Sequence, residues 1–200
     1  TIGLDLAKNV FQVHGITKDE EVLFNRPLRR AQLLPFFSKL EPCLIGMEAC
    51  SGAHHWAREL TELGHDVRLI PPMYVKPYVK RGKSDAIDAA AICEAVTRPT
   101  MRFVAVKTVE QQALLSLHRA RDLLVRQRTQ LINGLRGMAA EFGVYIAKGV
   151  ARIIGFAEDI LAGEVLDLPE IANEVIHNLC EHLMALHARI RWYEERLKLV

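Results

Sequence analysis

Four carboxylates stand where the surrounding sequence is apolar. Asp5 interrupts an apolar run at the start of the chain, and Glu48 ends a second one. Burying a carboxylate is unfavourable unless it is paired or bound to a cation. Asp85 and Asp88 are three residues apart at the start of a predicted helix, so they share one face and repel each other unless a cation lies between them. The alternatives are that Asp5 and Glu48 face solvent and that the helical pair complements the helix dipole.

Together the four residues predict a divalent-metal site. Carboxylate oxygens are hard ligands that favour Mg²⁺ or Mn²⁺. The four cysteines form no CxxC or CxxH pair, and the histidines lack the spacing of zinc ligands, so a zinc site is disfavoured. Two divalent ions about 3.5–4 Å apart can activate a nucleophile and stabilise the leaving oxygen in phosphodiester cleavage.

The elements predicted around these residues form an α/β fold. Strands are expected over 1–7, 9–17, 21–25, 43–48 and 66–70, and helices over 28–40, 53–63 and 85–97. Gly64 is placed to end the second helix, and Ser84 to cap the third. The order predicts an antiparallel meander that continues into a mixed sheet with flanking helices. It is the order expected of an RNase H-like fold, although other α/β topologies begin in the same way.

The second half of the chain is predicted to be helical. Leucine or methionine recurs every seven residues from 117 to 138 within a helix over 109–142, and a second helix over 169–200 has apolar residues at spacings of three and four. These patterns predict a long coiled-coil hairpin that pairs within the chain, between chains or both. A simple hairpin without a partner is the alternative. We expect a domain boundary between 1–107 and 108–200.

Basic residues are concentrated in the middle of the chain. Residues 68–136 hold 13 basic and 5 acidic side chains, whereas residues 1–67 hold 7 and 9 and residues 150–200 hold 5 and 9. This distribution predicts a surface for a polyanion. The candidate contacts are Lys76, Lys80, Arg81, Lys83, Arg119, Arg121, Arg126 and Arg128. Solvated loop charges and salt bridges within the helical hairpin are the alternatives.

Three segments, at 2–11, 47–52 and 80–89, resemble the motifs of the IS110 family of bacterial insertion-sequence transposases. The resemblance implies a RuvC-like, RNase H-fold domain with a DEDD tetrad that binds metal and acts in catalysis, followed by a coiled coil used in assembly. On this chain the tetrad corresponds to Asp5, Glu48, Asp85 and Asp88. The resemblance also implies a C-terminal domain with a serine nucleophile. No segment here resembles that domain, so we expect the sequence to be a fragment.

The function implied is that of a DNA transposase or recombinase that binds DNA and a structured noncoding guide RNA, called a bridge RNA. Mg²⁺ or Mn²⁺ at the tetrad would assist strand cleavage and exchange, and the coiled coil would form a dimer or larger assembly. A stand-alone Mg²⁺-dependent nuclease of the Holliday-junction type and a non-catalytic nucleic-acid-binding assembly module are the alternatives. No apolar run approaches 20 residues, so no membrane segment is expected, and the protein is predicted to be cytoplasmic and associated with the bacterial nucleoid.

Overall fold

The computed structural model describes residues 1–80, 82 and 84–199. They form two compact units, Thr1–Thr108 and Val109–Val200, and each unit is described by itself. The predicted contacts Arg81 and Lys83 and the last residue of the predicted helix 169–200 lie outside the described residues. Within the described ranges, no helix combines the length and the apolar character needed to cross a membrane.

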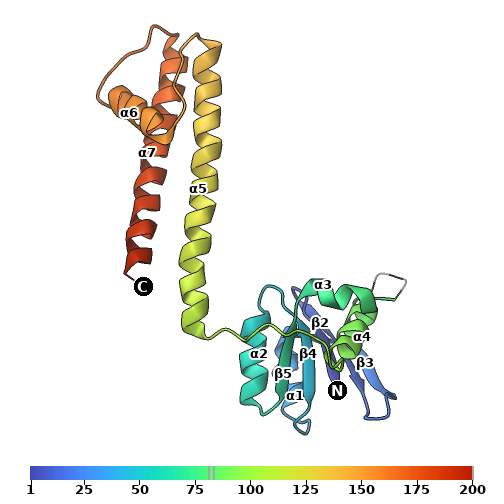
Figure 1. Ribbon diagram of the computed structural model, residues 1–200. Coiled ribbons are helices and arrows are strands. Elements are labelled where there is room, and N and C mark those ends of the chain that lie inside the picture. Colours follow the sequence, from blue (N-terminus) through green and yellow to red (C-terminus); the bar gives the residue numbers. More distant parts are fainter. Residues whose placement is uncertain (81, 83, 200) are drawn as a thin grey trace. The chain divides into compact units, whose positions relative to one another are not determined.

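The first unit is built on a five-stranded mixed sheet (Figure 1). Its strands are β1 (Ile2–Asp5), β2 (Val10–Ile16), β3 (Val22–Arg29), β4 (Leu44–Glu48) and β5 (Asp66–Ile70). They lie in the order β3-β2-β1-β4-β5, in which the first three pair antiparallel while β1, β4 and β5 pair in parallel. The predicted meander and the mixed sheet are therefore confirmed.

Helices flank this sheet on both faces. They are α1 (Leu33–Phe37), α2 (Ala53–Glu62), α3 (Pro72–Val75) and α4 (Asp85–Val96). Strand side chains alternate between the two faces. Leu4 and Met47 are fully buried in the core that also contains α1 and α2. Their neighbours Gly3 and Gly46 face α4, because an added Cβ would lie 2.1 Å from the Ala89 carbonyl oxygen and 2.7 Å from the Val96 Cβ, respectively. Helix α4 thus lies directly on the backbone of the two central strands.

The predicted helix over 28–40 is wrong at its start. Strand β3 continues to Arg29, followed by a 3₁₀ turn at Arg30–Gln32 and the short helix α1. The strand is longer than predicted because it pairs with β2 along its whole length, where Leu28 lies opposite Phe11. Pro27 is tolerated there because β3 is an edge strand, which can lack one ladder donor.

Two predicted helix ends have different outcomes. Gly64 adopts a φ of 92° after α2, and its amide donates to Thr61 while the His65 amide donates to Leu60, so the predicted C-terminal glycine cap is confirmed. Ser84 is the N-cap residue of α4, but its hydroxyl makes no capping hydrogen bond. The Ser84 carbonyl instead accepts from the amides of Ile87 and Asp88.

The second unit consists of α5 (Val109–Glu141), α6 (Val150–Leu161) and α7 (Glu170–Lys198). Helices α5 and α7 pack against each other within the chain and share a core that contains Leu135 and Leu183 (Figure 1). Helix α6, which was not predicted, adds Ile153 and Ala157 to that core. Met138, the last residue of the seven-residue pattern, is 43% exposed, so the pattern does not describe a fully buried seam.

Candidate metal centre

A repeated spacing places the first two carboxylates. Strand β1 reads Gly3-Leu-Asp5 and strand β4 reads Gly46-Met-Glu48, and the two glycines lie opposite each other in the parallel pair. Since side chains two residues apart point to the same face, Asp5 and Glu48 lie on the α4 face at the carboxyl ends of neighbouring strands. This common Gly-x-carboxylate spacing is a signal in the sequence that links Asp5 to Glu48 in addition to their apolar surroundings.

Helix α4 supplies the other two carboxylates from its first turn. One oxygen each of Asp5, Asp85 and Asp88 lie within 4.8 Å of one another. Asp5 and Asp88 are half-buried, whereas Asp85 is exposed. Glu48 is not part of this group of three, but it lines a cavity of about 380 Å³ together with Asp5, Asp88 and Lys76. The structure therefore brings three of the predicted ligands into one cluster and places the fourth at the same cavity.

The electrostatics of the cluster are unfavourable for the charged carboxylates. Burial, followed by repulsion from Asp88, Asp85 and Glu48, raises the pKa of Asp5 from 3.8 to about 6, although the Leu6 amide opposes the shift. Burial and the Asp88 carboxylate also raise the pKa of Glu48. Within residues 1–80, 82 and 84–199, no lysine or arginine forms an ion pair with these carboxylates. A cation between them would relieve this repulsion.

The donor set fits a hard divalent cation. All of the clustered ligands are carboxylate oxygens, which suit Mg²⁺ and Mn²⁺ better than zinc. Cys50 lies close enough for Glu48 and Asp5 to affect its thiol, but burial and these two charges raise its pKa. A protonated thiol is a poor nucleophile and a poor metal ligand. Elsewhere in the described part of the chain, no group of three histidine, cysteine or acidic side chains has comparable spacing.

The predicted lysine contacts lie at different places. Lys76 lines the acidic cavity, where an ammonium group can meet a phosphate. Lys80 lines a second cavity on the other side of α4. Arg81 and Lys83 lie outside the described residues. Only Lys76 therefore borders the candidate metal centre among the lysines whose positions are described.

The predicted arginine contacts all lie on α5. The Arg121 guanidinium forms an ion pair with Glu194 of α7 at 3.0 Å. Arg128 contacts the His187 ring at 3.4 Å. Arg119 and Arg126 are exposed. The alternative of pairing within the helical hairpin thus describes Arg121, while Arg119 and Arg126 remain available to an external polyanion.

Comparison with known proteins identifies the family of the chain. Residues 2–142 match the model of the IS110-type DEDD family, whose description is "Transposase". The chain is 52% identical over 198 residues to a probable family 20 transposase of Pseudomonas aeruginosa. This match covers 98% of this chain and 59% of that protein. It is 41% identical over 197 residues to the transposase for insertion sequence element IS1328 of Yersinia enterocolitica, in a match that covers 98% of this chain and 58% of that protein.

A third relative is the transposase for insertion sequence element IS1111A of Coxiella burnetii, which is 43% identical over 199 residues. That match covers 100% of this chain and 55% of the relative. The chain thus spans between half and three fifths of the length of these curated relatives. The family match covers more than half of the chain and includes all four predicted carboxylates. The chain belongs to the IS110-type DEDD transposase family.

Proposed function

We propose that this chain is the metal-binding part of an insertion-sequence transposase that cleaves and exchanges DNA strands. Asp5, Glu48, Asp85 and Asp88 hold Mg²⁺ or Mn²⁺ next to the DNA backbone. The observation that carries the proposal is the cluster of three carboxylates within 4.8 Å, in which the pKa of Asp5 is raised to about 6. Family membership supports it, since the DEDD name of the family refers to a set of four acidic residues.

The arrangement of the first unit supports a RuvC-like, RNase H-fold assignment for residues 1–107. Three antiparallel strands are followed by two parallel ones, and β1 lies at the centre of the sheet. Asp5 and Glu48 lie at the carboxyl ends of neighbouring parallel strands, which is where open α/β sheets commonly carry their sites. We propose this fold as the frame that fixes the carboxylates relative to DNA.

The carboxylates and Lys76 have different tasks at the proposed centre. When bound, the cation lowers the pKa of an attacking hydroxyl or water and stabilises charge on the leaving oxygen. Asp5 would hold it from the sheet and Asp85 and Asp88 from the helix, with Glu48 at the same cavity. Lys76 at the cavity wall contributes positive charge toward an entering phosphate. The close contact of α4 with Gly3 keeps the helical carboxylates over the strand ends.

The proposed partners are DNA, a structured guide RNA and further copies of the chain. The exposed side chains of Arg119 and Arg126 on α5 supply charge for the nucleic acids. Assembly through the α5–α7 hairpin is part of the proposal. We also propose that a serine nucleophile supplied by another part of the full-length protein completes the reaction, since the chain spans only 55–59% of the length of these relatives.

A strand-transfer assay tests the proposed function. Labelled branched and linear DNA is incubated with the chain in Mg²⁺ or in EDTA, and binding and cleavage are read from the same gels. We expect binding without recombination by wild type, and loss of any Mg²⁺-dependent gain in binding with Asp5→Asn combined with Asp88→Asn. Efficient recombination by residues 1–200 would contradict the need for an outside nucleophile. Strong Mg²⁺-dependent nicking of branched DNA alone would favour the nuclease alternative.

A further inference from the structure

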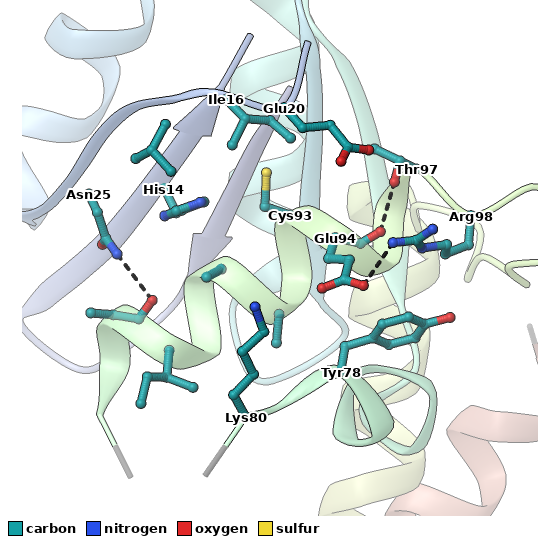
Figure 2. Close-up of a pocket in the computed structure, with 15 residues that line it drawn as sticks. His14, Ile16, Glu20, Asn25, Tyr78, Lys80, Cys93, Glu94, Thr97 and Arg98 are labelled. Atoms are coloured by element: carbon teal, nitrogen blue, oxygen red, sulfur yellow. Dashed lines mark hydrogen bonds and ion pairs between the residues drawn. The ribbon is translucent and has the colours of Figure 1, made fainter. Parts of the chain in front are cut away.

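A second cavity lies between α4 and the strands β2 and β3 (Figure 2). Its volume is about 470 Å³, within the range of about 300–1,000 Å³ typical of small-ligand sites. The strands contribute His14, Ile16 and Asn25 to its wall, and α4 contributes Ala86, Ile87 and Ala90. Neither Asp5, Glu48 nor the two aspartates of α4 line it.

The two cavities occupy opposite sides of the same helix. Successive residues of an α-helix are rotated by about 100°. Asp85 and Asp88 therefore share one side of α4, and Ala86, Ile87 and Ala90 share the other. The acidic centre and the second cavity therefore lie on opposite sides of the first turns of α4.

His14 is the feature of the second cavity that the fold does not explain. The side chain belongs to a residue only 9% exposed, and within the described residues its Nδ1 atom has no hydrogen-bond partner. Burial lowers the pKa of His14 and so favours the neutral ring, which has one donating and one accepting nitrogen. Buried polar atoms are normally hydrogen-bonded. The Nδ1 atom is itself buried, so a ligand in the cavity supplies the missing bond only once the imidazole ring has turned by half a turn, which exchanges the positions of Nδ1 and Cδ2.

His65 provides a contrast within the same unit. It is 3% exposed, but its Nδ1 accepts from the Cys43 amide at 3.3 Å and its Nε2 lies 3.2 Å from the Phe37 carbonyl oxygen. Both ring nitrogens of that histidine are therefore satisfied by the chain itself. The unsatisfied ring of His14 is consequently not a general property of buried histidines in this fold.

The charges around the second cavity define the class of ligand. Arg98 and Glu94 neutralise each other through an ion pair of 2.7 Å (Figure 2). Glu20 and Lys80 add one further charge of each sign. The wall therefore offers both donors and acceptors with no net charge, which disfavours a simple anion or cation. Small apolar side chains on α4, such as Ala90, complete a surface suited to the face of a planar heterocycle.

We propose that this second cavity holds one unstacked nucleobase that has an exocyclic amino group. The phosphates of the strand that carries this base pass close to Lys80. The amino group of the base donates to the carboxylate of Glu20 or Glu94, and the His14 ring makes a further hydrogen bond to the base. The face of the base lies on Ile87 and Ala90. The inference rests on the proposed function, because it requires a nucleic-acid strand to reach α4. It assigns a role in holding one base, which is separate from the metal centre.

Fluorescence of 2-aminopurine tests this proposal, since this amino-bearing base brightens when it leaves the base stack. Short single-stranded DNA and RNA oligonucleotides with one central 2-aminopurine are titrated with the chain in EDTA, so that no metal contributes. We expect a saturable rise with wild type. His14→Leu is expected to weaken binding about tenfold through loss of its hydrogen bonds. Ala90→Leu fills the cavity with a good helix former and is expected to abolish the rise.

The control is His55→Leu, which changes an exposed histidine on α2 in the same way. Circular dichroism verifies that each variant is folded. The proposal is overturned when no rise occurs with either oligonucleotide, or when folded His14→Leu and Ala90→Leu both match wild type. A larger rise with DNA or with RNA identifies the source of the base. Asp5→Asn is expected to retain the rise, so a failed metal centre and a failed base cavity give different results.

Discussion

Charged side chains are arranged in opposite ways at the acidic cluster of the first unit and in the helical hairpin of the second. In the first unit, Asp5 and Asp88 are held half-buried beside each other, and the pKa of Asp5 rises to about 6 as a result. In the second unit, Arg121 pairs with Glu194 across the hairpin, and Arg136 donates to two backbone carbonyls, at 2.7 and 3.0 Å. The first arrangement opposes stability and the second supports it. Unfavourable charge placement therefore marks the site, while the ordinary arrangement marks the scaffold.

Glycines show the same contrast. An alanine Cβ at Gly3 would overlap the Ala89 carbonyl oxygen, whereas nothing lies within 4 Å of a Cβ built at Gly137 of α5. The first glycine is required for α4 to approach the sheet, and the second is a helix-interior glycine without a packing reason. Each unit contains one of the two tryptophans, Trp56 or Trp192, which allows their unfolding to be followed separately.

The largest expected effect comes from alanine at these two glycines. Gly3→Ala is expected to destabilise the first unit by about 2 kcal/mol, because α4 must move away from β1. Gly137→Ala is expected to stabilise the second unit by about 1 kcal/mol through helix propensity. Urea unfolding in a Trp192→Phe background reports the first unit through Trp56, and far-ultraviolet circular dichroism reports the helices. If both alanine substitutions changed the free energy of unfolding by the same amount and in the same direction, the two glycines would not differ in role as described.

A smaller effect is expected from Asp5→Asn in the absence of metal. The raised pKa means that the folded state binds the Asp5 proton more tightly than the unfolded state, so stability falls as pH rises from about 4 to about 6. Well above pH 6 the asparagine variant should be more stable than wild type. Near pH 4, where Asp5 is largely protonated in the fold, the difference should shrink toward zero.

The measurement is urea unfolding in EDTA across this pH range. Asp19→Asn, in the exposed turn between β2 and β3, removes an equal charge away from the cluster and serves as the control. Its pH profile is expected to follow that of wild type. A constant difference between Asp5→Asn and wild type at every pH would show that repulsion at the cluster does not govern the stability of the first unit.

The smallest effect is expected from Glu194→Ala in the second unit. Its ion pair with Arg121 joins partly exposed side chains, with 42% and 35% of their surfaces accessible. Pairs of this kind typically contribute about 0–1 kcal/mol and weaken in salt. Thermal unfolding at low and high salt should therefore differ little between the variant and wild type. A loss above about 2 kcal/mol would make this pair a main support of the hairpin rather than a surface contact.

Much of the first unit could be predicted because its signals are local. The strand β4 is a short apolar run, β5 ends at a pair of prolines, and the carboxylates Asp5 and Glu48 stand out against apolar neighbours. The end of β3 could not be predicted, since Leu28 and Arg29 become a strand only by pairing with β2. Tertiary pairing there overrides the local preference.

Other features required distances that no sequence pattern provides. The cluster of three carboxylates depends on how closely α4 lies on Gly3, and the cavity beside His14 depends on the angle between α4 and β2. Helix α6 is a different case. Its buried residues Ile153, Ala157 and Ile160 recur at spacings of four and three, so the sequence contains an amphipathic pattern from which this helix could be predicted.

The carboxylates on β1 and α4 are proposed to hold a divalent cation. Calorimetric titration of Mn²⁺ into the metal-free chain tests this proposal, with Asp88→Asn as the variant and Asp122→Asn, an exposed aspartate of α5, as the charge-matched control. We predict saturable binding by wild type and by the control, and a loss of at least about 100-fold in affinity for Asp88→Asn. Equal Mn²⁺ affinity for all three proteins, or none for wild type, would contradict the assignment.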